Sequence, residues 1–197
     1  MKTHLITICA AMILTSVAFG APVQDKAKAG QSTSTGESAI LYGRNFSYAV
    51  SEPNGWVLDS QAGKSQDLSV VFYKRGQSWQ NGDAVIYINL NSRRKGVSLE
   101  REAKEDVAEF SKREPDLLIA PAQPLQTRDG RKALTYTFLH RDGKPPFEKT
   151  AYIQMPTITQ TVVLTAKTRA SYDAALPTFA SIVGSLNFLT DKVTIKK

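Results

Sequence analysis

The sequence has little sulfur and little imidazole. One cysteine and two histidines occur among its 197 residues, and both Cys9 and His4 lie in the first twenty. If that segment is cleaved as a leader, the chain has no thiol, which excludes disulfides, thiolate metal sites and cysteine nucleophiles together. His140 then stands alone, whereas a zinc site needs several nitrogen or sulfur ligands. We therefore expect no metal. The sequence also has no glycine-rich phosphate loop and no dinucleotide fingerprint, so we expect no cofactor.

Familiar catalytic constellations are also missing. A Ser–His–Asp triad would have to use His140, yet no Gly-x-Ser-x-Gly elbow occurs in the sequence. Asp142, two residues further on, is better explained by its turn, and a lone histidine beside a hairpin is usually a surface residue. We assign no catalytic residue, and the sequence argues more against an enzyme than for one.

The first twenty residues have the pattern of a cleavable secretory signal. Lys2 supplies a positive start, and Leu5–Phe19 contains no charged residue. Ala18 and Gly20 are small residues where signal peptidase requires them, so we predict cleavage between Gly20 and Ala21. The alternative is a transmembrane anchor, but the apolar run has about 15 residues whereas a spanning helix needs ~20. We expect a periplasmic or secreted protein with no stable membrane insertion after cleavage.

Composition divides the rest of the chain into three parts. Residues 21–39 hold one valine and no aromatic residue, which is too little apolar area for folding, and they are predicted to be a disordered tether. Residues 40–190 are predicted to form a single globular domain, and 191–197 a C-terminal tail. After cleavage, 24 Lys and Arg stand against 18 Asp and Glu, a formal charge of +6. This charge favours an anionic partner, although it is also ordinary for a soluble protein. Nucleic acid is not expected, because export removes the usual target and no recognition motif occurs.

Short strands and tight turns open the predicted domain. Alternating apolar residues predict a strand over 46–50, residues 52–55 form a turn in which proline fixes φ, and 56–59 resumes the extended chain. The runs 68–73 and 84–90 are apolar on both faces, as in strands that are covered on both sides.

Two amphipathic helices follow the pattern of apolar residues every three or four positions. The first begins after Ser98 as N-cap and ends at Pro115. The last places apolar residues between Tyr172 and Leu186 on one face, and Pro177 implies either a kink or a helix that begins there.

An antiparallel meander lies between these helices. Leu117–Gln126 is predicted to pair with Lys132–His140 around Asp129-Gly130, a dipeptide typical of tight hairpins. Two further strands follow, Phe147–Gln154 and Thr159–Lys167. Together these elements predict an α+β fold in which helices sandwich an antiparallel sheet.

This layout resembles the PsbP-like superfamily. In Tyr48–Trp56 an aromatic strand runs into a Pro-Asn-Gly-Trp turn, which is similar to the opening of these domains. The capped helix, the meander and a final helix leading to Val183–Phe188 are similar too, so the resemblance covers about residues 46–189. The superfamily includes the PsbP extrinsic subunit of oxygenic photosystems, a nuclear Ran-release factor and the bacterial envelope protein DcrB. The resemblance implies an α/β/α sandwich in a family that mostly binds or stabilises other proteins, and it transfers no functional residue.

Trp79 is a candidate binding residue. It stands beside Arg75 in a polar, glycine-bounded loop between two predicted strands. An aromatic residue in such a loop is either tucked back as a lid or presented to a ligand, and the sequence favours neither. Gln77, Gln80 and Asn81 add hydrogen-bonding groups that would suit a sugar- or peptide-like ligand.

Two charged features complete the candidates. The run Arg93, Arg94 and Lys95 precedes the first helix and would dock an anion or, more commonly, be simply solvated. Glu148 lies in a strand-forming run and would act as a ligand-orienting carboxylate or as half of a glycosidase-type pair. For Glu148 we favour a structural interpretation, in which it is a cross-strand partner for a lysine or arginine.

The sequence therefore predicts an exported, non-enzymatic binding or accessory protein of the cell envelope, with a protein or an anionic envelope component as its partner. The alternative is a hydrolase or lyase that acts on an envelope polymer through carboxylates such as Glu148, with Trp79 as a stacking platform. A third possibility is a structural protein that its N-terminal segment spaces from a partner. Two carboxylates lining one deep cleft would favour the enzyme.

Overall fold

A computed structural model of the chain describes residues 38–64 and 66–193. The predicted signal, all but the last two residues of the predicted tether, and the last four residues of the chain lie outside the described residues. The strands are β1 (Ser38–Gly43), β2 (Phe46–Ser51), β3 (Trp56–Asp59), β4 (Val70–Lys74), β5 (Ala84–Ser92), β6 (Leu117–Gln126), β7 (Lys132–His140), β8 (Phe147–Gln154), β9 (Ile158–Ala166) and β10 (Asn187–Thr190). The helices are α1 (Ser60–Lys64), α2 (Leu99–Arg113) and α3 (Arg169–Ser185).

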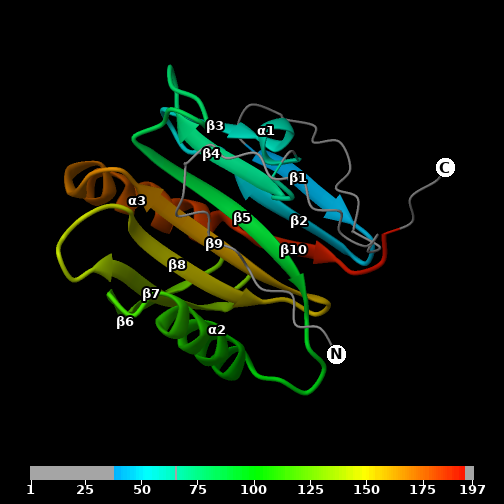
Figure 1. Ribbon diagram of the computed structural model, residues 1–197. Coiled ribbons are helices and arrows are strands. Elements are labelled where there is room, and N and C mark those ends of the chain that lie inside the picture. The colour runs from blue at the N-terminus through cyan, green and yellow to red at the C-terminus, as the bar shows by residue number, and fades with distance from the viewer. Residues whose placement is uncertain (1–37, 65, 194–197) are drawn as a thin grey trace, which may run out of the picture.

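The strands form two antiparallel sheets (Figure 1). The larger sheet has seven strands in the order β3-β4-β5-β9-β8-β7-β6, and the smaller has the order β1-β2-β10. The predicted meander is present, because β6 pairs with β7, β7 with β8, and β8 with β9. β9 then pairs with β5 along its whole length and joins the meander to the first half of the sheet.

Helices α2 and α3 cover opposite faces of the large sheet (Figure 1). Successive residues of a strand point to opposite faces, and β8 shows which helix lies on each. Ile153 belongs to the main core together with Tyr172 and Phe179 of α3. Tyr152 packs with Leu99 of α2 on the other side. The predicted α+β fold, an antiparallel sheet between helices, is confirmed.

The small sheet goes beyond the sequence prediction, which had a single sheet. It lies on the α3 side, because Leu41, Tyr48 and Val50 are at most 1% exposed and belong to the same core as α3. β1 begins at Ser38, two residues before the predicted start of the domain at 40. Ala39 is also 1% exposed, so the final residues of the predicted tether belong to the core.

Both long helices begin at side-chain caps. Ser98 Oγ accepts a hydrogen bond from the backbone N–H of Arg101 at 3.3 Å, as a cap at the predicted position should. α3 begins after Thr168, whose side chain and backbone exchange hydrogen bonds with Ser171. It continues through Pro177, so the alternative in which this helix begins at the proline is wrong.

No helix in the described part of the chain combines the length and the apolar character that crossing a membrane requires.

Candidate functional site

The residues nominated from sequence lie in three separate places. Arg75 and Trp79 are in the loop from β4 to β5, residues 93–95 are in the loop from β5 to α2, and Glu148 is in β8. The two loops lie at opposite ends of β5 (Figure 1). A strand of this length spans ~30 Å at about 3.3 Å per residue. These candidates therefore do not form one site.

Trp79 is tucked back onto the sheet. Its ring meets that of Tyr87 edge to face, with 5.8 Å between the centroids, and it packs against a small core on the α2 side of the sheet. The polar groups of the loop bond to one another. Gln77 Nε2 donates to Asp83 Oδ2 at 2.8 Å, and the Asn81 side chain accepts from a backbone N–H in the loop at 2.7 Å. Trp79 is therefore a lid, and two of the amides that suited a ligand are already engaged.

Arg75 braces the turn before β3. Its Nη2 lies 2.9 Å from Glu52 Oε1 and also donates to the carbonyl of Trp56 at 3.3 Å. The arginine side chain is 67% exposed, so an ion pair of this kind contributes only about 0–1 kcal/mol. Arg75 ties its loop to the neighbouring turn.

Glu148 is buried without a cation. It is 5% exposed, and its Oε1 has no hydrogen-bond partner. Its cross-strand neighbours are Phe138 on β7 and Thr165 on β9. Among the described residues, no lysine or arginine forms an ion pair with it. The interpretation we favoured, a cross-strand partner for a lysine or arginine, is therefore wrong.

Burial also changes the proton affinity of this side chain. Removal from water raises the pKa of Glu148 to about 7; the Thr165 hydroxyl acts in the opposite direction, and the negative charge of Glu114 adds to the rise. A raised pKa of this kind is common in catalytic acids. At 5% exposure, however, the carboxyl does not reach a polymer substrate in this conformation.

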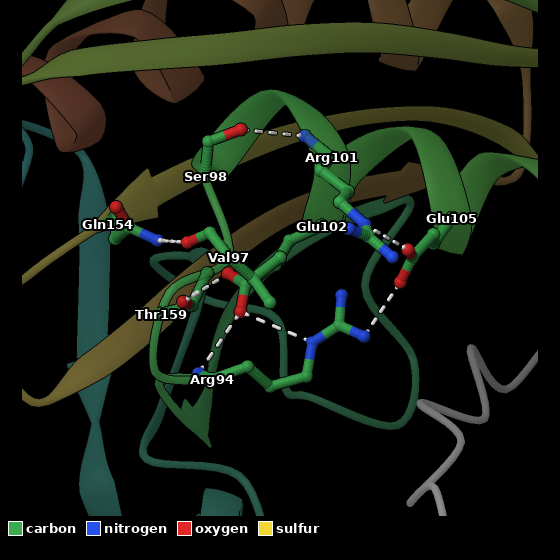
Figure 2. A network of polar contacts seen from close by, with 8 residues as sticks. All are labelled: Arg94, Val97, Ser98, Arg101, Glu102, Glu105, Gln154 and Thr159. Carbon is green, nitrogen blue, oxygen red and sulfur yellow. Dashed lines mark hydrogen bonds and ion pairs between the residues drawn. The ribbon is translucent and has the colours of Figure 1, made fainter.

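Arg94 is held by two glutamates of α2 (Figure 2). Its Nη1 lies 2.7 Å from Glu105 Oε2, and its Nε lies 3.5 Å from Glu102 Oε1. Glu105 also pairs with Arg101 at 2.8 Å, and the buried Glu102 accepts the hydroxyl hydrogen of Thr159 at 2.6 Å. Figure 2 shows the Arg94 side chain turned toward the helix, between the two carboxylates. Arg94 thus fixes its loop to the fold and is not available for an external anion.

Three other cations remain exposed at this end of the molecule. The β1–β2 turn meets the β8–β9 turn, because Thr157 donates its hydroxyl hydrogen to the carbonyl of Asn45 at 2.7 Å. The β5–α2 loop meets the same turn, because the backbone N–H of Arg93 donates to the Thr157 carbonyl at 3.1 Å. The side chains of Arg44, Arg93 and Lys95 are exposed here. None of the three pairs with an acidic residue within 38–64 or 66–193. We call Arg44, Arg93 and Lys95 the cationic tip.

His140 lines a surface depression at the far end of β7. The depression has a volume of about 260 Å³ and is also lined by Asp116, Arg141 and Asp142. Asp142 Oδ2 lies 2.8 Å from Lys144 Nζ, and Oδ1 accepts the backbone N–H of Lys144 at 3.0 Å. The hydrogen bonds from Lys144 lower the pKa of Asp142. Asp142 is therefore a turn residue, as its sequence context indicates.

The chain is similar in fold to cyanobacterial PsbP. The match is to the solution structure of PsbP from Synechocystis sp. PCC 6803, with 15% sequence identity and a TM-score of 0.48, and it covers 88% of this chain and 98% of that chain. The match concerns the arrangement of the elements alone. No protein-family model and no curated protein matches the sequence.

Two features of the sites escape sequence reasoning. Arg44 joins the cationic tip because sheet packing brings the β1–β2 turn to residues that follow it by about fifty positions, and no local signal marks that approach. Glu148 does not pair with the lysine or arginine expected from the sequence, because its cross-strand neighbours are Phe138 and Thr165. In the part of the chain that the structure describes, no group of three or more His, Cys, Asp or Glu side chains is placed to hold a metal ion.

Proposed function

We propose that the chain is an exported, non-enzymatic binding or accessory protein of the cell envelope that docks on an anionic envelope component through the cationic tip. The observation that supports the proposal is that neighbouring cations differ in whether a carboxylate neutralises them. Arg94 is neutralised by Glu102 and Glu105, whereas the charges of the tip, from Arg93, Lys95 and the distant Arg44, face solvent together.

The size of this patch implies a weak and salt-sensitive attachment. A lysine or arginine near an anionic membrane surface contributes ~1 kcal/mol, so three contribute ~3 kcal/mol, which is on the order of a 100-fold gain in partitioning. Exposed charges are screened over about 8 Å at physiological ionic strength. An affinity of this kind suits a protein that is concentrated at an envelope surface and makes its specific contacts there.

Two properties of the sequence are in keeping with the proposal. The predicted cleavage after Gly20 would deliver the domain to the envelope, and the chain that remains carries a formal charge of +6. Long-range attraction by this net charge would raise the rate of encounter with an anionic surface, while the tip would set the orientation of the bound domain.

Co-sedimentation of the chain that begins at Ala21 with lipid vesicles tests the proposal. We expect binding to vesicles that contain phosphatidylglycerol, weak binding to phosphatidylcholine vesicles, and loss of binding as salt is added. Heparin as a soluble competitor distinguishes a lipid surface from a dissolved polyanion as the better ligand. Replacement of Arg44, Arg93 and Lys95 by alanine should lower partitioning by roughly 100-fold.

The matched control removes three exposed cations elsewhere, in a Lys64→Ala, Lys112→Ala, Arg141→Ala variant. It has the same net charge as the tip variant, so a general charge effect would weaken binding equally in both. Equal losses in the two variants, or equal binding of the unsubstituted chain to anionic and neutral vesicles, would refute docking through the tip.

A further inference from the structure

The first half of α2 is held to the large sheet by polar contacts. Glu102 accepts from Thr159 of β9 at 2.6 Å, and one turn later Asp106 Oδ2 accepts the phenol hydrogen of Tyr152 on β8 at 2.6 Å. Each contact joins a buried or half-buried carboxylate of the helix to a hydroxyl of the sheet. This half of the helix therefore has fixed, directional attachments.

The end of α2 is held in a different way. Phe110 rests edge to face on Phe138 of β7, with 5.4 Å between the ring centroids, and Arg113 covers the Phe110 ring at 4.6 Å. Phe138 is the cross-strand neighbour of Glu148, and the helix ends at Glu114 as C-cap. The last turn of α2 therefore lies on an apolar contact that borders a buried carboxyl.

Neutral Glu148 suits this place, and ionised Glu148 does not. Its Oε1 has no hydrogen-bond partner, and the fully buried hydroxyl of Thr150, two residues along the same face of β8, has none either. Glu114 adds a negative charge nearby. The C-terminus of a helix carries a partial negative charge as well. A carboxylate here would be desolvated and repelled, with no cation to compensate.

We propose that Glu148 is a proton-binding carboxyl that couples pH to the docking of the last turn of α2. While the carboxyl is protonated, the turn lies on Phe138. When the proton passes to water, the Thr165 hydroxyl alone does not compensate for the burial of the carboxylate, and the last turn of α2 detaches to admit water. The polar contacts of Glu102 and Asp106 keep the first half of the helix in place.

The titratable and charged groups around Glu148 lie on the strands and the helix that surround it. His140 lies two residues beyond Phe138 on the same face of β7 and lines the surface depression together with Asp116. Lys149, the neighbour of Glu148 in sequence, points to the opposite face, where its Nζ lies 5.9 Å from the centre of the Phe179 ring. Among the titratable and charged groups on the elements packed around Glu148 are Asp106, Glu109, Arg113, Glu114, Tyr136, His140 and Tyr152, and Glu114 is the one whose charge acts on Glu148 most directly.

Hydrogen exchange of the full chain at about pH 5.5 and about pH 8.5, corrected for intrinsic exchange rates, tests the proposal. A raised pKa changes an equilibrium by about tenfold per unit. Only the interval from about pH 5.5 to the pKa of about 7 acts on this equilibrium, so protection of the amides of residues 110–114 should fall roughly 30-fold at the higher pH. Protection of residues 102–106 should stay unchanged. In Glu148→Gln, protection of 110–114 should be the same at both pH values. As a control, Glu109→Gln removes a carboxyl from α2 itself and should keep the wild-type dependence of protection on pH.

Two results would overturn the proposal. One is equal protection of residues 110–114 at both pH values in the wild type, and the other is a Glu148→Gln variant whose protection still falls as that of the wild type does. Should the variant fold poorly, carbon-13 titration of the Glu148 carboxyl in the wild type decides the question. A midpoint at the ordinary glutamate value of about 4.3 would show that the group does not hold its proton.

Discussion

The hydroxyl of Thr159 donates to the carboxylate of Glu102 across 2.6 Å and so joins β9 to the first turn of α2. The same carboxylate accepts the backbone N–H of Arg94 at 3.3 Å and lies 3.5 Å from the Arg94 Nε. One buried acid is thus stabilised by a strand and by a loop while belonging to a helix. This joint positions the loop whose other cations, Arg93 and Lys95, belong to the cationic tip.

Thr159→Val should destabilise the fold by about 1–3 kcal/mol, because the buried Glu102 carboxylate loses a donor while the shape of the side chain is kept. Urea denaturation followed by circular dichroism measures the change. Thr137→Val is the matched control on β7, where the hydroxyl makes a long bond of 3.4 Å to the carbonyl of Ala120. An equal, small effect in both variants would show that the Thr159 hydrogen bond contributes no more to the free energy of unfolding than the long Thr137 bond does.

Arg94→Ala and Lys95→Ala should behave differently although they are neighbours. Arg94 is 44% exposed and pairs with Glu102 and Glu105, so its loss should lower the free energy of unfolding by about 1 kcal/mol. Lys95 has no ion pair with a described residue, and its substitution should stay within ~0.5 kcal/mol. Vesicle binding, in contrast, should be weakened more by Lys95→Ala than by Arg94→Ala. If Arg94→Ala had the larger effect on both the free energy of unfolding and vesicle binding, the cations that stabilise the fold and those that dock would not be different residues.

Trp79→Ala should lower the free energy of unfolding by roughly 2 kcal/mol, since the ring is partly buried against Tyr87 and truncation of a core tryptophan costs about 3–5 kcal/mol. Trp79→Phe should recover much of this loss, because an aromatic ring still meets Tyr87. Gln80→Ala, an exposed neighbour in the same loop, serves as the control. Unchanged unfolding of Trp79→Ala would mean that the ring is presented to solvent after all.

Glu148 should make the fold less stable as the pH rises from about 4.5 to about 7. The unfolded chain loses this proton first, so the folded state binds more protons in that window and stability falls with pH. A pKa raised from 4.5 to about 7 corresponds to ~3 kcal/mol at about 1.4 kcal/mol per unit.

Urea denaturation at a series of pH values measures this effect. In Glu148→Gln the decline between about pH 4.5 and about pH 7 should be absent, whereas Glu109→Gln should keep it. A Glu148→Gln variant whose stability parallels that of the wild type across the window contradicts the assignment.

Local signals in the sequence predicted the elements that depend on neighbouring residues. Ser98 was identified as a cap because an N-cap acts within its own turn, and Asp129-Gly130 placed the β6–β7 hairpin because its geometry is set by two residues. The boundaries of β8 followed from β-branched and aromatic residues bounded by turn residues.

The features that could not be predicted from the sequence depend on contacts between residues that are distant along the chain. β10 pairs with β2, so that Asn187 meets Ala49, and no local pattern predicts such a pairing. The partner of Glu148 depends on the register of three strands. Register placed Phe138 and Thr165 beside it, where a lysine or arginine was expected. The pairing of Arg94 with Glu102 requires the intervening turn to fold back on the helix, which the spacing of the two residues alone does not specify.

The small sheet has a mechanical consequence. β1 and β10 both run antiparallel to β2, so they are parallel to each other, and the chain enters the sheet at Ser38 beside Ser51 but leaves it at Thr190 beside Ser47. Tension applied between these two ends acts along the strands. The hydrogen bonds that join β2 to its neighbours are then loaded in shear and must break together, whereas a pull across the sheet would open them one at a time. A domain that is stretched between its two ends would resist unfolding in that direction more than in any other.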